Sequence, residues 1–431
     1  MNFLIPNSIK DSFYNSNSRK ILFFWFPILV LFLITNIGTD SLYNYLEKGM
    51  SLFISEYFSR YTYLNVDVDE FFYKIIVPFK SSLFSIGFIM IIVGFYKTNK
   101  LSINLDYKKS ITIILILVCL VSSIFIKQMG AGYLLSSVEP FTQPTNWYYR
   151  RILVPFLSYF THLNGGLYNV FHYILVLFLV ALSIKFLNFS GLWKNISIFT
   201  SGFIIFQFQF PGYVEILIGI FVLMIFSLKL TNYQKLILFG FSLITHESAC
   251  VFMFFPIISL FEKKENIFNY LIIFTLYVFT VLLNFKFNFT ELFDLQTTIG
   301  EKSSLVIFKE NIKYVLLGVF FSYKLLWIFV LLFFIDKRIS LKIKFSMMII
   351  LFFPLIQTYF AIDYSRLSSF GFISLFVILK HINETYKNKK LINLILLLNL
   401  IIPSFYVGPS SLQLVNGLYS LVFNLLSTIV N

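Results

Sequence analysis

Apolar stretches that are long enough to cross, or nearly cross, a bilayer recur along the whole chain. A membrane-spanning helix needs about 20 mostly apolar residues, and the shorter stretches approach this length when flanking Tyr, Ser and Asn residues are included. The stretches are 21–37, 81–96, 111–126, 168–187, 196–209, 213–228, 235–245, 249–261, 267–284, 315–335, 345–362, 367–379 and 391–405, with 417–430 as a further candidate. We therefore expect an all-α polytopic integral membrane protein with about 12–14 transmembrane helices.

The amino-acid composition is typical of an integral membrane protein. Hydrophobic residues make up 58% of the sequence and charged residues 13%, whereas soluble domains carry about 25% charged residues. No small-residue cleavage site follows the first apolar stretch, so we interpret it as a permanent span and not as a signal peptide. Cys119 and Cys250 lie in apolar segments without metal-ligand spacing. They predict neither a zinc site nor a disulfide framework.

The distribution of charge predicts the orientation of the spans. Lys10, Arg19 and Lys20 precede the first span, which places the N-terminus in the cytoplasm. If the spans alternate, every inner loop is short and basic, and most acidic residues fall on the outer side. The net charge of +14 therefore indicates membrane topology, and no nucleic-acid partner is expected.

The longer polar segments all fall on the outer side of this topology. They are 38–74, 127–165 and 285–314, within a single transmembrane domain that we assign to 1–431. A membrane protein with elaborated loops on one side is expected to carry out recognition or chemistry there. The expected location is a bacterial inner (plasma) membrane, with multiple spans and a periplasmic or extracellular active face.

Two adjacent arginines, Arg150 and Arg151, lie in the outer stretch NWYYRRILVPF. The following run, 152–162, is too short to span and contains a proline, so we expect an interfacial helix after the third span. In one interpretation, both arginines extend to lipid phosphates beside an aromatic belt. In the other, at least one binds the phosphate of a lipid-linked substrate, because the planar guanidinium matches phosphate oxygens.

Three further outer motifs carry charge next to apolar segments. Glu215 follows a predicted Pro-Gly turn, where it is either a charge that stabilises the helix start or a functional carboxylate. His246 and Glu247 interrupt an apolar region, either as a local cap or as site residues. Asp363 and Arg366 are spaced to pair on one helical turn, and Arg366 could also face the same site as the two earlier arginines.

Acidic residues of the outer loops are candidates for the catalytic base. Asp40 and Asp69 lie in the first outer loop, and Glu139 precedes the arginine pair. Such carboxylates could act as a base or bind a divalent cation, although most loop acids are simply solvated. Glu247 is a fourth catalytic candidate. No cofactor or metal-ligand set is assigned, and a divalent cation remains an alternative.

The order of these motifs resembles bacterial polytopic envelope proteins of the GT-C glycosyltransferase superfamily. The matching segments run from about 139 to 366, and they are YYRRILVP, PGYVE, HESA and DYSR. The composition is also similar to that of O-antigen or capsule repeat-unit polymerases. This resemblance implies a catalytic carboxylate in the first outer loop, at Asp40 or Asp69.

The resemblance implies glycosyl transfer from a polyprenyl-phosphate or pyrophosphate sugar donor to a glycan acceptor. Arg150 and Arg151 are then expected to bind the donor phosphate, assisted by Arg366. Glu215, His246 and Asp363 are expected to line the substrate site. Two alternatives are a transporter or flippase for a lipid-linked glycan and a non-catalytic membrane scaffold.

Overall fold

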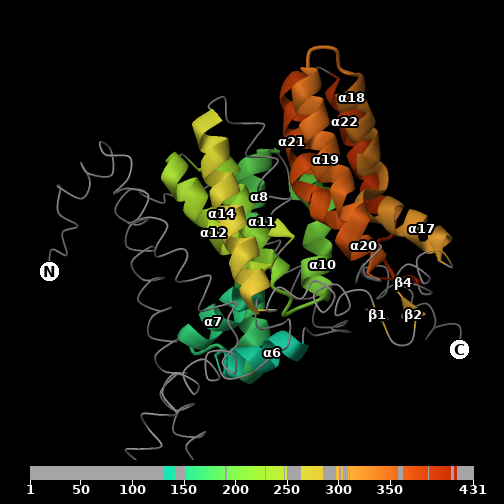
Figure 1. Ribbon diagram of the computed structural model, residues 1–431. Helices are drawn as coiled ribbons and strands as arrows, with labels where there is room; N and C mark the ends of the chain where they lie inside the picture. Colours follow the sequence, from blue (N-terminus) through green and yellow to red (C-terminus); the bar gives the residue numbers. More distant parts are fainter. Residues whose placement is uncertain are drawn as a thin grey trace, which may run out of the picture.

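The computed structural model describes part of the chain in two large blocks and several short pieces (Figure 1). The described residues are 131–141, 151–189, 192–228, 230–246, 248–249, 264–284, 298–299, 302–303, 309, 311–357, 363–386, 388–408 and 412–414. The predicted spans 21–37, 81–96, 111–126 and 417–430 and nearly all of 249–261 lie outside them, as does the first outer loop, 38–74.

The described part is mostly helical, in agreement with the predicted class. Its α-helices are α6 (Ala131–Val138), α7 (Leu153–Phe160), α8 (Tyr168–Leu187), α9 (Leu192–Phe199), α10 (Phe203–Gln209), α11 (Glu215–Ser227), α12 (Asn232–Thr245), α14 (Lys264–Asn284), α17 (Ile312–Tyr323), α18 (Trp327–Ile335), α19 (Leu341–Gln357), α20 (Tyr364–Ser368), α21 (Phe372–Thr385) and α22 (Lys389–Ile401). Short 3₁₀ helices are η3 (Gly165–Leu167), η4 (Lys324–Leu326) and η5 (Ser369–Gly371).

Three helical segments of the described part are long and apolar enough to cross a membrane. They are Tyr168–Leu187, Ile312–Ile335 and Tyr364–Thr385. Large apolar side chains such as Leu316, Leu331 and Leu394 are exposed on α17, α18 and α22. Apolar surface of this kind is typical of helices that face lipid.

The helices α8, α11 and α21 run in the same direction. Tyr168, at the start of α8, donates a hydrogen bond to the carbonyl oxygen of Gly212, just before α11. At the other end of these two helices, the rings of Phe186 and Phe226 lie 6.1 Å apart. Lys380 of α21 lies over the ring of Phe186, with Nζ 4.8 Å from the ring centroid. The starts of α8 and α11 therefore lie together, whereas Phe372, at the start of α21, lies beside Gly219 inside α11.

Two predicted spans are interrupted by breaks in the helix. The stretch 196–209 forms α9 and α10, separated at Gly202, which has a φ of +73° that favours glycine. The stretch 315–335 forms α17, η4 and α18, with Lys324 at a φ of +49°. Lys324 is fully buried and donates from Nζ to the carbonyl oxygen of Ile402 and to Ser404 Oγ. These bonds connect the break to the segment after α22.

Two small antiparallel sheets accompany the helices. β1 (Thr298–Ile299) pairs with β2 (Lys302–Ser303) inside the predicted outer loop 285–314. β3 (Phe405–Val407) pairs with β4 (Leu412–Leu414), with Phe405 opposite Leu414. The all-α prediction did not include these strands. The second sheet matters for the site because β3 contacts α17 and α20.

Close packing between α17 and α20 depends on Gly318. A Cβ atom at this position would lie 2.7 Å from Tyr364 Cβ and 3.0 Å from the Ser365 backbone nitrogen. We expect Gly318→Ala to force the helices apart and to lower the free energy of unfolding by about 1–3 kcal/mol. Thermal unfolding in lipid nanodiscs measures this change. Leu316→Ala is the matched control on α17, since Leu316 is 66% exposed; equal melting of both variants would contradict the packing argument.

Candidate functional site

A buried ion pair connects the start of α11 to α20. Glu215 is the first residue of α11 and is 3% exposed, and Arg366 in α20 is 8% exposed. Nη1 of Arg366 donates to Glu215 Oε1 over 3.0 Å. Both charged groups are removed from water, so each compensates the desolvation of the other, and loss of either would leave an uncompensated buried charge.

The turn before α11 positions Glu215. Pro211 and Gly212 form the predicted tight turn, and Gly212 has a φ of +93° that glycine adopts without steric cost. A carboxylate at the first position of a helix is stabilised by the positive end of the helix dipole. The interpretation of Glu215 as a helix-start charge therefore agrees with its position, and the structure adds its cationic partner.

Arg366 also pairs with Asp363, as the three-residue spacing predicts. Nε and Nη2 of Arg366 donate to Asp363 Oδ2 over 3.1 and 2.5 Å. The guanidinium carbon lies 4.1 Å from the ring centroid of Tyr213, in cation–π geometry. Arg366 thus contacts two carboxylates with all three of its nitrogens, an arrangement that orients both.

Tyr406 extends the network to β3 by donating from its hydroxyl group to Asp363 Oδ1. Burial, together with the charge of Asp363, raises the pKa of Tyr406 well above its usual range. The hydroxyl therefore stays protonated and can act as a donor. Sequence reasoning missed Tyr406, because no spacing relates it to Asp363.

His246 approaches the same carboxylate from the end of α12. Its Nδ1 accepts a hydrogen bond of 3.1 Å from the backbone N–H of Ser248 and lies 2.8 Å from Ser248 Oγ. An Nδ1 that accepts leaves the ring proton on Nε2. Nε2 lies 3.9 Å from Glu215 Oε1, so the protonated nitrogen faces the carboxylate. His246 therefore makes a local contact with Ser248 and also lies near Glu215, while its role in substrate binding stays a prediction.

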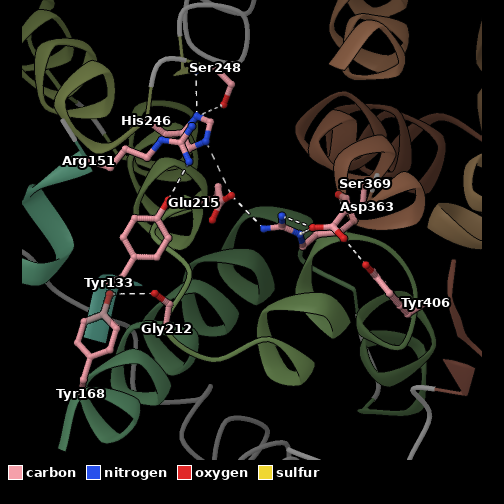
Figure 2. A network of polar contacts seen from close by, with 11 residues as sticks. Tyr133, Arg151, Tyr168, Gly212, Glu215, His246, Ser248, Asp363, Ser369 and Tyr406 are labelled. Atoms are coloured by element: carbon pink, nitrogen blue, oxygen red, sulfur yellow. Dashed lines mark hydrogen bonds and ion pairs between the residues drawn. The ribbon is translucent and has the colours of Figure 1, made fainter. Parts of the chain in front are cut away.

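Arg151 enters the site from the segment just before α7. It is 9% exposed, and its Nη1 donates to the hydroxyl of Tyr133 in α6 over 2.8 Å. The ring of Tyr133 packs edge-on against Tyr213, with 6.1 Å between the centroids. In Figure 2, the Arg151 side chain points toward His246. Tyr213 also stacks on Arg366, so Arg151 belongs to the same cluster of side chains.

The structure brings together five of the candidates, which are Arg151, Glu215, His246, Asp363 and Arg366 (Figure 2). Glu139 lies just after α6 and is exposed at the surface. The candidates Asp40, Asp69, Arg150 and Glu247 lie outside the described residues. Helix α7 confirms the predicted short helix after Arg151, although its position at a membrane interface remains a prediction.

Another charged cluster lies at the far end of α21. Arg338 pairs with Asp336 at 2.7 Å, and His381 Nε2 lies 3.4 Å from Asp336 Oδ2. Hydrogen bonds from Arg338 hold the pKa of Asp336 well below its usual range. Fifteen residues separate Arg366 from His381, roughly 22 Å of helix. This cluster therefore provides ion-pair controls that are remote from Glu215.

Within the described ranges, no group of three or more His, Cys, Asp or Glu side chains could hold a metal ion. The divalent cation considered for the first outer loop stays a prediction, because that loop lies outside those ranges. Comparison of the chain with protein-family models, curated proteins and solved structures gave no match.

A double-mutant cycle tests the pairing of Glu215 and Arg366. We expect Arg366→Gln to lower the free energy of unfolding by about 3–5 kcal/mol, because it leaves buried carboxylates without their cation. Glu215→Gln combined with Arg366→Gln should cost clearly less than the sum of the single changes. Denaturation in nanodiscs measures all three variants, with Arg338→Gln as the control in an ion pair whose arginine is exposed. Strict additivity would contradict the pairing.

Proposed function

We propose that the chain is a membrane-embedded glycosyltransferase of cell-envelope polysaccharide assembly. Its donor is a sugar linked to a polyprenyl phosphate or pyrophosphate, and its acceptor is a glycan. The transfer of repeat units in O-antigen or capsule synthesis is included in this class. Two features support the proposal: helices of membrane-spanning length, and a buried site that contains both cationic side chains and carboxylates.

The buried charge cluster is the observation that carries the proposal. Arg151, His246, Arg366 and two carboxylates come from separate segments of the chain and meet at the start of α11. Ionisable groups inside apolar helical proteins are costly, which makes them candidates for a functional site. A lipid-linked donor lies in the bilayer, and three helices of membrane-spanning length support a protein that meets it there.

The relative direction of the helices supports an outward site. Glu215 lies at the start of α11 and Arg366 in α20, which precedes α21, at the end that the charge pattern assigns to the outside. Lys185 and Lys380 lie near the opposite ends of α8 and α21. We accordingly propose a multi-pass protein of a bacterial inner membrane, with a cytoplasmic N-terminus and an active face toward the periplasm or cell exterior.

Arg151 is the proposed ligand of the donor phosphate, together with its neighbour Arg150. The Tyr133 hydroxyl engages Nη1 of Arg151, which fixes the orientation of the planar guanidinium. Arg366 contacts Glu215 and Asp363 with all three nitrogens, so we assign it the positioning of these carboxylates. Charge that develops on the departing phosphate would be stabilised by Arg151.

A transporter of a lipid-linked glycan is the second candidate. The ion pair between Glu215 and Arg366 joins two helices that belong to different parts of the sequence, and such a pair could separate during transport. The two functions differ in their product, because only the transferase forms a new glycosidic bond.

Arg151→Ala is expected to lower sugar transfer by on the order of a hundredfold or more, because it removes a donor to the leaving phosphate. Arg151→Lys should retain part of the activity, since it keeps the charge but loses the planar fork. The measurement is the formation of radiolabelled glycan from polyprenyl-linked sugar by the purified full chain in nanodiscs.

Arg338→Ala is the matched control, because Arg338 is an ion-paired arginine at the far end of α21. It should leave transfer unchanged. Normal transfer by Arg151→Ala and Arg150→Ala would contradict the assigned phosphate site. Movement of labelled lipid across the bilayer without any new glycosidic bond would favour the transporter.

A further inference from the structure

The two oxygens of the Glu215 carboxylate have different surroundings. Arg366 Nη1 donates to Oε1, and His246 Nε2 faces the same oxygen. Oε2 is buried and has no hydrogen-bond partner among the described residues. A buried acceptor without a donor costs about 1–3 kcal/mol. Oε1 of Glu215 is thus held by Arg366, and Oε2 is available to accept a hydrogen bond from a ligand.

His172 presents a second unpaired acceptor near Glu215. This residue is fully buried in α8, one turn after Tyr168. Its Nε2 lies 2.9 Å from the carbonyl oxygen of Gln207, which can only accept, so Nε2 carries the proton. The lone pair then lies on Nδ1, which has no partner in the described part of the chain. His172 lies near the start of α11, because Tyr168, one turn earlier in α8, donates to the carbonyl oxygen of Gly212, three residues before Glu215.

We infer that Glu215 Oε2 and His172 Nδ1 form a binding site for hydroxyl groups of the acceptor sugar, and that Glu215 is the general base. This inference rests on the proposed glycosyl transfer. Both free atoms are acceptors, so a matching ligand must bring donors, as sugar hydroxyls do. A phosphate brings negative charge and would be repelled by the carboxylate. The phosphate therefore belongs at Arg151 and the hydroxyl groups at Glu215.

With the phosphate at Arg151 and the acceptor hydroxyl at Glu215, the transfer reaction proceeds as follows. Glu215 Oε2 takes the proton of an acceptor hydroxyl, whose oxygen forms a bond to the anomeric carbon of the donor. The bond from that carbon to the phosphate oxygen breaks, and its electron pair leaves with the polyprenyl phosphate or pyrophosphate. Glu215 then releases the proton to water. Arg366 acts as a positioning residue, because it holds Oε1 and directs Oε2 to the substrate.

Glu215→Gln tests the assignment of the base. We expect transfer to fall at least about a hundredfold, the usual contribution of a general base, while binding of the donor lipid is retained. Azide needs no deprotonation, so it should restore consumption of the donor by Glu215→Gln and yield a glycosyl azide. Glu215→Asp keeps the charge opposite Arg366 but withdraws the oxygen by one methylene, and it should also lose transfer. Asp336→Asn, a paired carboxylate at the far end of α21, should leave transfer unchanged.

A binding experiment separates this inference from the proposed function. The probes are methyl glycosides of hexoses and N-acetylhexosamines, detected by saturation-transfer NMR with the full chain in nanodiscs. We expect binding to the wild type and at least a tenfold loss of affinity in Glu215→Gln and Glu215→Asp. If glycosides bind in this way but the wild type forms no glycosidic bond, the hydroxyl site stands and the transferase proposal fails.

Two results would overturn the inference. The first is glycoside binding that is absent in the wild type or equal in Glu215→Gln, which would exclude a hydroxyl site at Oε2. The second concerns the base. Transfer by Glu215→Gln within about threefold of the wild type would exclude Glu215 as the base, since a general base contributes far more. Donor that binds normally to this variant and yet does not react with azide would exclude it as well.

Discussion

The guanidinium group of Arg366, buried between two carboxylates, is the interaction on which the site depends. It joins Glu215 at the start of α11 to Asp363, and Asp363 in turn binds Tyr406 of β3. A buried cation of this kind needs full compensation, because desolvation removes several kcal/mol of hydration. The pairing therefore fixes three distant segments in one arrangement. It also explains why Oε1 of Glu215 is bonded while Oε2 has no hydrogen-bond partner among the described residues.

Interruptions in apolar helices allow this arrangement to form. The break at Lys324 lies directly after Ser322 and Tyr323, whose side chains bond to the backbone of Ser365 and Ser368 around Arg366. Gly318 lets α17 approach α20 closely. Non-helical backbone inside a membrane protein is tolerated where it is buried in protein, as at these positions. Apolar packing thereby holds the segment that carries the charge cluster.

Much of the helical framework could be predicted from the sequence, because long apolar runs leave few alternatives. The predicted span 168–187 coincides with α8, and the pairing of Asp363 with Arg366 follows from one helical turn. The bond from Arg366 to Glu215 joins residues 151 positions apart, which the spacing in a single sequence does not reveal. The break at Lys324 was also missed, since no proline or glycine marks it. Tyr406 directly follows the predicted span 391–405, where no sequence pattern indicated a partner for Asp363.

Cryo-electron microscopy of the full chain in nanodiscs, with a non-hydrolysable phosphonate analogue of a polyprenyl-linked sugar and a glycan acceptor, tests the central claim most directly. We predict the phosphonate within hydrogen-bond distance of Arg151 and an acceptor hydroxyl within hydrogen-bond distance of Glu215 Oε2, with the bonds from Arg366 to both carboxylates intact. A ligand bound away from Arg151 and Glu215, with the charge cluster unchanged and without substrate contacts, would contradict a catalytic site at the start of α11.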